Sequence, residues 1–305
     1  MSTLFSRFYG KINQISPLEN NFTGVLDAIA VKPKMLYFRG KIPENMMDDD
    51  LTKRPKCVAI VGTRHCTKYG EEVAYKIAFE LAKRGVVVIS GLAYGIDSIA
   101  HRAALDAEGV TVAVLGTPID QIYPRAHEGL AREIVEKGGA IMSEYAVGEK
   151  VYPKTSFLAR NRLIAGLSDA VVIVEAAERS GSLNTAMHAL DQGKELFVVP
   201  GDITRPMSAG CNRLLKQGAN PYTGIDDLLD FYFPKRRKAG LKQIVLFGDT
   251  PEEMSLIKIM HDGVKNGEEM VQKAGMSVAL FNQTMTMLEI KGLVRSLGAN
   301  QWMLK

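Results

Sequence analysis

The chain has 305 residues, of which 46% are hydrophobic and 24% are charged, a composition typical of a folded globular protein and not of a disordered or collagen-like one. Its 38 Lys and Arg residues against 34 Asp and Glu give a formal net charge of +4, which permits a polyanionic partner without requiring one. The three cysteines are too few for a disulfide framework. The first residues lack a signal-peptide pattern and no apolar run reaches transmembrane length, so we expect a cytoplasmic protein without a membrane partner.

Residues 1–50 have weak patterns, and we assign them to a reduced N-terminal extension. Met35–Phe38 has the apolar residues of a short strand, and Met46–Asp50 is typical of a loop. We expect this segment to extend the following core and not to form a domain of its own.

Residues 51–233 alternate short β-branched runs with segments of helical periodicity. We predict strands at Cys57–Val61, Val86–Ser90, Thr111–Leu115, Ala140–Ser143, Ala170–Glu175 and Glu195–Val199. We predict helices at Tyr69–Arg84, Ile96–Ala107, Ala126–Lys137, Phe157–Leu167, Leu183–Gln192 and Asn212–Gln217. Strands without polar alternation, each followed by a helix, indicate an α/β fold with a doubly wound, mostly parallel sheet. Its functional edge should be formed by the carboxyl ends of the strands.

Two further segments follow the core. Residues 234–247 begin with a basic run and are assigned to a linker, and residues 248–305 form a small C-terminal domain. The domain has helical patterns at Glu252–His261, Glu268–Ala274 and Ser277–Lys291. Strand patterns follow at Leu293–Ser296 and Gln301–Leu304. Three helices closed by a hairpin predict a winged helix. The third helix has no arginine, so we expect it to contact protein or to support a dimer, and not to read a DNA sequence.

Small or hydroxyl-bearing turns follow the predicted strands of the core. They are Gly62-Thr63-Arg64, Ser90-Gly91, Gly116-Thr117, Ser143-Glu144, Ser180-Gly181-Ser182 and Gly201-Asp202. Glycine lets the backbone approach a ligand and helix-start amides attract anions, so the turns together predict a phosphate-binding rim. Connection geometry alone also favours Gly and Ser at any one turn. Arg64 is the strongest candidate, because no turn geometry requires a guanidinium.

The segment from Lys154 to Arg162 predicts a groove for nucleic acid. Lys154 and Phe157 are three residues apart at a helix start and can face one ligand, the ammonium against a phosphate and the ring against a base. Phe157 can instead be a hydrophobic anchor. Arg160 and Arg162 do not share a helix face, so one of them is expected to brace a loop or to pair with an acid, with Asn161 capping or bridging between them.

Other polar residues carry weaker signals for catalysis. Asp97 and His101 are four apart and have the spacing of an acid–base pair or of half a metal site. No further ligand has suitable spacing, so we expect a structural pair that holds the Gly91–Gly95 loop, and no metal. Glu144 and Glu175 lack a partner nucleophile and are expected to organise loops. The dinucleotide and NTPase glycine motifs do not occur, so we expect no cofactor.

An ordered series of short motifs runs through the core. It consists of Gly62–Arg64, Ser90–Asp97 with His101, Ala113–Gly116 leading to Tyr123-Pro124, Ser143–Tyr145, Arg160–Leu167, Val174–Ala176 with Ser180–Ser182, and Pro200–Asp202. Over roughly residues 25–230 this series resembles the DNA-processing protein A (DprA or Smf) family. The C-terminal domain also resembles the small domain at the end of many members.

The resemblance implies an extended Rossmann-like core in a protein that is not an enzyme. It implies sequence-independent binding of single-stranded DNA, a homodimer, and loading of the RecA recombinase on DNA taken up in natural transformation. The pocket that it implies uses Arg64, Lys154, Phe157 and the Arg160–Arg162 segment. Together with the turns, the expected DNA-binding residues are Gly62, Thr63, Arg64, Ser90, Gly91, Lys154, Phe157, Arg160, Asn161, Arg162, Ser180, Gly181 and Ser182.

The chain departs from the family pattern at several places. Thr117-Pro118 stands where the family has the end of a Gly-x-Gly motif, and His127 stands in place of an asparagine. We therefore expect this loop to bind differently. Residues 1–50 are too short for the complete helical N-terminal domain of longer members.

Two alternatives come from other classes of protein. A nucleoside monophosphate phosphoribohydrolase on a similar sheet would release a base, but such enzymes use a Pro-Gly-Gly-x-Gly-Thr loop with a following glutamate. This chain has Arg179–Thr185 there, without that acid. A sequence-specific regulator would act through the winged helix, whose third helix lacks a basic face.

Overall fold

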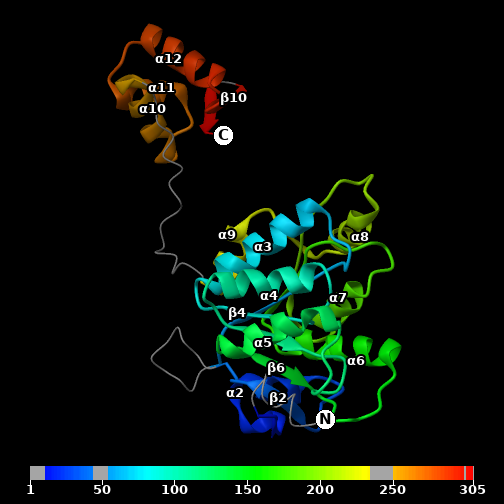
Figure 1. Ribbon diagram of the computed structural model, residues 1–305. Coiled ribbons are helices and arrows are strands. Elements are labelled where there is room, and N and C mark those ends of the chain that lie inside the picture. The colour runs from blue at the N-terminus through cyan, green and yellow to red at the C-terminus, as the bar shows by residue number, and fades with distance from the viewer. Residues whose placement is uncertain (1–10, 44–53, 234–249, 299, 305) are drawn as a thin grey trace. The chain divides into compact units, whose positions relative to one another are not determined.

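The computed structural model describes residues 11–43, 54–233, 250–298 and 300–304. The chain divides into two compact units, Met1–Pro234 and Lys235–Lys305 (Figure 1). The loop expected at Met46–Asp50 and the linker expected at residues 234–247 lie outside the described residues. Within the described ranges, no helix is both long and apolar enough to cross a membrane.

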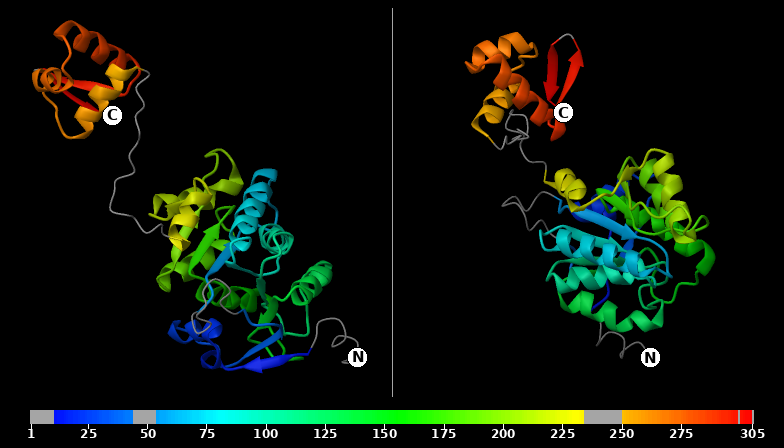
Figure 2. Two further views of the ribbon diagram at one scale, coloured as in Figure 1. Left: turned by 90° about the vertical axis from the view of Figure 1, so that its left-hand side faces the viewer. Right: turned by 90° about the horizontal axis from the view of Figure 1, so that it is seen from above.

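A mixed sheet, with nine strands among the described residues, forms the centre of the first unit (Figures 1 and 2). The strands are β1 (Asn13–Ile15), β2 (Leu36–Gly40), β3 (Cys57–Val61), β4 (Val87–Ser90), β5 (Thr111–Val114), β6 (Ala140–Ser143), β7 (Ala170–Ile173), β8 (Glu195–Val198) and β9 (Asn220–Pro221). Their spatial order is β1-β2-β6-β5-β4-β3-β7-β8-β9. The strands from β3 to β9 pair in parallel, whereas β2 joins β6 and β1 joins β2 antiparallel. The predicted α/β fold with a mostly parallel sheet is confirmed.

Helices cover both faces of this sheet. One face carries α3 (Lys68–Ala82), α4 (Ile96–Asp106), α5 (Glu128–Glu136) and α9 (Ile225–Tyr232). The other carries α2 (Asn21–Gly24), α6 (Pro153–Gly166), α7 (Ser182–Asp191) and α8 (Ala209–Lys216). Val58 and Ile60 of β3 pack under α3 and α4, while Cys57, Ala59 and Val61 face the opposite layer. Because both faces are buried, the strand has no polar alternation.

The second unit contains three helices and a hairpin among its described residues. They are α10 (Pro251–His261), α11 (Gly267–Ala274), α12 (Val278–Ile290), β10 (Val294–Gly298) and β11 (Gln301–Leu304). The two strands pair antiparallel. Gly275 ends α11 with a φ of 63°, a left-handed conformation that favours glycine. Met270, Phe281, Met285 and Leu288 are fully or almost fully buried in the core of this unit.

The order of connections in the sheet reverses beside β3. From β3 the chain moves outward through β4, β5 and β6, and it then returns to place β7 on the other side of β3. Ligands of open α/β sheets bind beyond the carboxyl ends of the strands at such a switch point. The turns after β3 and β7 therefore mark the place where a binding site is expected.

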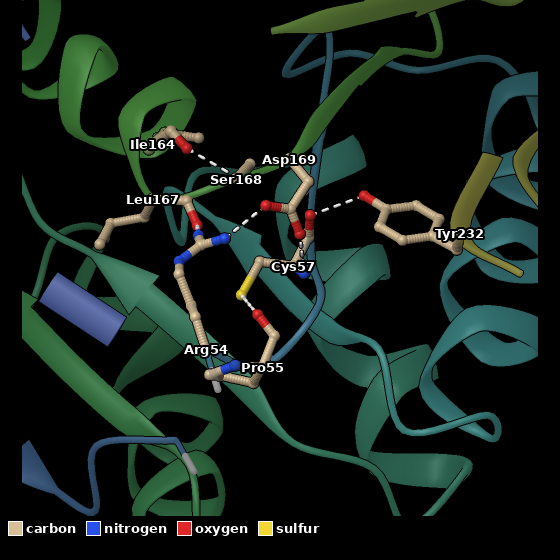
Figure 3. A network of polar contacts seen from close by, with 8 residues as sticks. All are labelled: Arg54, Pro55, Cys57, Ile164, Leu167, Ser168, Asp169 and Tyr232. Atoms are coloured by element: carbon tan, nitrogen blue, oxygen red, sulfur yellow. Dashed lines mark hydrogen bonds and ion pairs between the residues drawn. The ribbon is translucent and has the colours of Figure 1, made fainter. Parts of the chain in front are cut away.

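A polar network secures the opposite, amino-terminal end of β3 (Figure 3). The Asp169 carboxylate accepts a hydrogen bond of 2.7 Å from the Cys57 backbone N–H and also pairs with Arg54. Arg54 donates to the carbonyl oxygen of Leu167, the residue after α6. The Tyr232 hydroxyl donates to the Cys57 carbonyl oxygen at 2.6 Å. The network thus ties α6 and α9 to one strand.

Replacing Asp169 by Ala should lower the free energy of unfolding by about 2 kcal/mol, because the Cys57 N–H and the Arg54 guanidinium lose their acceptor. Urea denaturation followed by circular dichroism measures this change. Asp27→Ala is the matched control, since Asp27 forms an exposed ion pair of 2.9 Å with Lys32 and should cost less than about 1 kcal/mol. Equal losses in the two variants would contradict the role assigned to the network.

Candidate nucleic-acid interface

A cavity of about 330 Å³ lies at the switch point, beyond the carboxyl ends of β3 and β7. We call it the switch-point pocket. The turn after β3, one side of α6 and the start of α7 line it. The predicted residues that it brings together are Gly62, Thr63, Arg64, Phe157, Arg160, Asn161, Ser180, Gly181 and Ser182.

Arg64 extends from a turn that is held rigidly at its base. The Thr63 N–H donates to the Glu175 carbonyl oxygen at 2.8 Å, and the Thr63 carbonyl oxygen accepts from the Ile96 N–H at 3.3 Å. A Cβ at Gly62 would lie 2.6 Å from the Ile96 side chain, so Gly62 makes room for α4. Arg64 itself is exposed and forms no ion pair with a described residue. Its charge is therefore available to a ligand.

Glu175 organises the segment that leads from this turn into α3. Its carboxylate accepts hydrogen bonds from the Thr67 N–H at 2.8 Å and from the Thr67 hydroxyl at 2.6 Å. Thr67 is in turn the N-cap of α3. The expected loop-organising role of Glu175 is confirmed, and its carboxylate is engaged in the structure.

Arg160 lies under the pocket with only 5% of its surface exposed. Its guanidinium donates to the carbonyl oxygens of Gly91 at 2.8 Å and of Val114, and to the Asn161 side-chain oxygen at 3.2 Å. Burial lowers the pKa of Arg160 to about 10, while the charge of Asp97 acts in the opposite direction. Burial also raises the pKa of Asp97, against the effect of Arg160. Arg160 therefore braces the loops, the structural role left open for one of the two arginines.

Ser90 and Gly91, which were expected among the DNA-binding residues, are buried and do not line the switch-point pocket. The buried Ser90 hydroxyl donates to the Ile60 carbonyl oxygen at 2.7 Å. The Gly91 N–H donates to Asp97 at 3.0 Å, and a Cβ at Gly91 would clash with the Arg160 guanidinium. Both residues support the pocket because their polar groups are already paired inside the fold.

The expected pair of Asp97 and His101 does not form. Asp97 holds the Gly91 amide, whereas His101, one helical turn further, has its Nδ1 2.7 Å from the Thr111 hydroxyl. That hydroxyl donates to the Val88 carbonyl oxygen at 2.7 Å, so His101 is the donor to Thr111. Burial lowers the pKa of His101 to about 3, and the imidazole is neutral. Asp97 thus holds the loop that begins at Gly91, as predicted, but the predicted pairing with His101 was wrong, because His101 bonds to Thr111 of β5 instead.

Arg162 pairs with Glu144, as one of the two alternatives predicted. Its guanidinium lies 2.6 Å and 3.2 Å from the two carboxylate oxygens, and both side chains are largely buried. Such a bidentate pair leaves few guanidinium N–H groups free to bind a ligand. Lys154 lies in the first turn of α6, and its side chain is outside the described atoms.

The loop before α7 forms the second wall of the pocket. The Ser180 and Ser182 hydroxyls lie 2.8 Å apart, and the Asn161 side chain donates to the Gly181 carbonyl oxygen at 3.4 Å. A Cβ at Gly181 would meet nothing within 4 Å, so this backbone is open to an approaching ligand. The positive end of the α7 dipole adds to the attraction for an anion. Asn161 thus bridges Arg160, whose Nε donates to the Asn161 side-chain oxygen, to the loop before α7.

Phe157 brings an aromatic ring to the rim of the pocket. The ring lies 5.9 Å from the Arg64 guanidinium carbon, within cation–π range. A Cβ at Gly116 would lie 2.5 Å from the ring, so Gly116 makes room for Phe157. The Tyr123 ring is 5.3 Å from Phe157. Tyr123 was expected only as part of the Tyr123-Pro124 motif, and an aromatic residue in a loop at this edge of the sheet is the signal that could have predicted its place here.

The two arginines of the pocket should respond differently to replacement by Met. Arg160→Met should lower the free energy of unfolding by about 3–5 kcal/mol, because Asp97 loses its buried counter-charge and two carbonyl groups lose their donor. Arg64→Met should leave stability nearly unchanged, since Arg64 is exposed and pairs with no described residue. Urea denaturation compares them. A larger loss at Arg64 would reverse the two roles.

Comparisons with known proteins identify the family to which the first unit is similar. A family model described as DNA recombination-mediator protein A matches residues 13–233. The chain is 39% identical over 229 residues to the DNA processing protein DprA of Streptococcus pneumoniae, covering 75% of this chain and 77% of that protein. It is 48% identical over 177 residues to the putative DNA processing protein DprA of Mycobacterium tuberculosis, covering 58% of this chain and only 45% of that relative's length.

Two solved structures share the fold of the first unit. The X-ray structure of DNA processing protein A from S. pneumoniae has a TM-score of 0.62 and 38% identity, covering 75% of this chain and 77% of that one. A Helicobacter pylori structure, which addresses the single-stranded DNA binding mode of that DNA processing protein A, has a TM-score of 0.63 and 35% identity, covering 73% and 96%. With a family model that matches residues 13–233, the chain belongs to the DNA recombination-mediator protein A family, the DprA or Smf proteins.

Proposed function

We propose that the switch-point pocket binds single-stranded DNA without sequence preference. The observation that carries this proposal is Arg64, an exposed guanidinium without an ion-pair partner among the described residues, beside the Phe157 ring. A cation beside an aromatic surface suits a phosphate next to a base that is not stacked in a duplex. The H. pylori relative, whose structure concerns single-stranded DNA, supports the same ligand.

The groups that the pocket offers support binding without sequence preference. Arg64, the Ser180 hydroxyl and the open Gly181 backbone suit phosphate and sugar oxygens, which are the same for every base. Lys154, in the first turn of α6, is proposed to add a second phosphate contact. Phe157 offers a ring face, which accepts any base.

Replacing Arg64 by Ala should weaken binding to all oligonucleotides alike. We expect about a tenfold loss of affinity for oligo-dT at physiological salt, and the slope of log affinity against log salt should become shallower by about 0.7, the value for one phosphate contact on a single strand. Fluorescence anisotropy measures both quantities, and Lys154→Ala should behave in the same way.

Arg102→Ala is the matched control for this experiment. Arg102 on α4 is half-exposed, pairs with Glu133 at 2.6 Å, and does not line the switch-point pocket. Its replacement should leave affinity and salt slope unchanged. Unaltered binding by Arg64→Ala, or equal losses in the two variants, would remove Arg64 from the site.

We propose a binding protein and not an enzyme. Asp97 and His65 are the carboxylate and the imidazole that line the pocket among the described residues. Asp97 is committed to the Gly91 amide and to Arg160, and the exposed His65 ring makes no hydrogen bond to a described residue, so the two do not form an acid–base pair. Acid–base catalysis needs a carboxylate or an imidazole that reaches the reacting group. The alternative, a phosphoribohydrolase, would release free adenine from AMP. Chromatography of AMP incubated with the purified protein tests this alternative, and formation of adenine would favour the enzyme over the binding protein.

Family membership supports three wider proposals. We propose that the protein forms a homodimer, protects incoming single strands and loads the RecA recombinase during DNA uptake in the cytoplasm. Light scattering measures the dimer. Single-strand-dependent ATP hydrolysis by RecA measures loading, and a rate that does not respond to the protein would overturn that part of the proposal.

For the C-terminal unit we propose a winged helix that contacts protein. Helices α11 and α12 joined at Gly275 correspond to the helix-turn-helix, and the β10–β11 hairpin corresponds to the wing. The exposed side of α12 presents Leu280, Met287 and Ile290 and no arginine. This surface lacks the charge that DNA phosphates require.

A chain that ends at residue 234 should therefore bind oligo-dT with the affinity of the full chain, because the proposed phosphate contacts all lie in the first unit. Anisotropy titrations of both proteins at the same salt concentration make the comparison. A loss greater than about threefold would instead assign part of the DNA contact to the second unit.

A further inference from the structure

Two exposed tyrosines lie beside the switch-point pocket without a role in it. Tyr94, in the loop after β4, is 47% exposed, and Tyr123, in the segment after β5, is 51% exposed. Neither hydroxyl hydrogen-bonds to a described residue. Single exposed aromatic residues are ordinary, but these two occupy neighbouring loops at the functional edge of the sheet.

A second hollow connects the tyrosines to the pocket. Tyr94 and Tyr123 line it together with Arg64 and Phe157, and the last two also line the switch-point pocket. The second hollow has a volume of only about 20 Å³, too small for a nucleobase. A base at this place would therefore lie on the ring surfaces and would not enter a cavity.

Both rings are held in place before any ligand binds. The Tyr123 ring packs at 5.3 Å and 45° against Phe157. The Tyr94 ring meets the His127 ring edge-on at 4.9 Å, and His127 Nδ1 lies 2.7 Å from the Leu92 carbonyl oxygen. Aromatic rings fixed in this way lose little conformational entropy when a ligand stacks on them.

We propose that Tyr94 and Tyr123 continue the surface of Phe157 as a stacking track for the bases of the bound strand. This inference rests on the proposed function, and it gives the strand a path. The phosphates are held at the switch point between β3 and β7, and the bases pass from Phe157 over the loops that follow β4 and β5. The strand thus leaves the pocket towards the β5 side of the sheet and not towards β8.

The track makes the interface selective for unpaired strands. Every base can stack on an aromatic ring, and each stacked base strengthens binding of a single strand. In a duplex, however, the base faces are already covered by the neighbouring bases. Duplex DNA should therefore gain nothing from Tyr94 and Tyr123. His127 acts as a positioning residue, because it holds the Tyr94 ring and the backbone of the same loop.

The test uses the full chain with Leu or Phe in place of each tyrosine. Tyr94→Leu and Tyr123→Leu keep apolar bulk but remove the π face, so each should weaken binding of a long oligo-dT by about 5- to 20-fold. The Phe variants should bind like the unchanged protein. The salt slope should stay the same in all four, because no phosphate contact is lost. Tyr75→Leu is the control, since Tyr75 is a half-exposed ring on α3 outside both hollows.

Two readouts separate the track from the phosphate site. Fluorescence of 2-aminopurine in the oligonucleotide should be quenched on binding, and the quenching should fall in the Leu variants. If the Leu variants bind with the affinity of the unchanged protein while Arg64→Ala binds weakly, the track is overturned and the proposed function stands. If Arg64→Ala also binds normally, the proposed function fails with it. A shallower salt slope in the Leu variants would overturn stacking as the mechanism.

Discussion

The functional edge of this protein depends on the hydrogen bonds of the buried Arg160 guanidinium. A buried cation is tolerated only where hydrogen bonds and a counter-charge replace water, and here the Gly91 and Val114 carbonyl groups, the Asn161 side chain and Asp97 supply them. These partners come from the loop after β4, from β5, from α6 and from α4. One side chain therefore sets the position of α6 against the turns of the sheet. Phe157, almost one helical turn before Arg160, is presented at the rim as a result.

Charge is divided between support and binding at this edge. Arg160 and Arg162 are buried and paired, and they hold loops in place. Arg64 is exposed and unpaired among the described residues, and it sits on a turn whose backbone hydrogen-bonds to Glu175, just after β7, and to the first residue of α4. A cationic side chain can pair with a phosphate only where it is not already paired inside the fold. The modest net charge of +4 is thus compatible with a nucleic-acid site, because placement matters more than the total.

The two ends of β3 have different structural roles. At the amino end, Asp169, Arg54 and Tyr232 tie the strand to α6 and α9 (Figure 3). At the carboxyl end, the reversal of strand order opens a crevice, and its lining comes from segments that are distant in sequence. The pocket is thus built from the turn after β3, from α6 and from the start of α7, beside a strand whose amino end is fixed. The proposed aromatic track extends this prepared surface and does not need a separate element.

The short strands β1 and β9 and the helices α2 and α9 were not predicted from the sequence. The sequence alone did predict strands β2 to β8, the other helices that flank them and the place of Arg64, because burial on both faces produces apolar strands and because no turn needs a guanidinium. It did not determine which polar residues face solvent. Ser90, Gly91 and Arg160 turned out to be support, the Asp97–His101 pair does not exist, and Gly116 makes room for Phe157. Each of these outcomes depends on contacts between segments far apart along the chain, such as the bond of Arg160 to Gly91, 69 residues away. Local spacing predicts which face of a helix a residue occupies, but only the tertiary structure decides what that face meets.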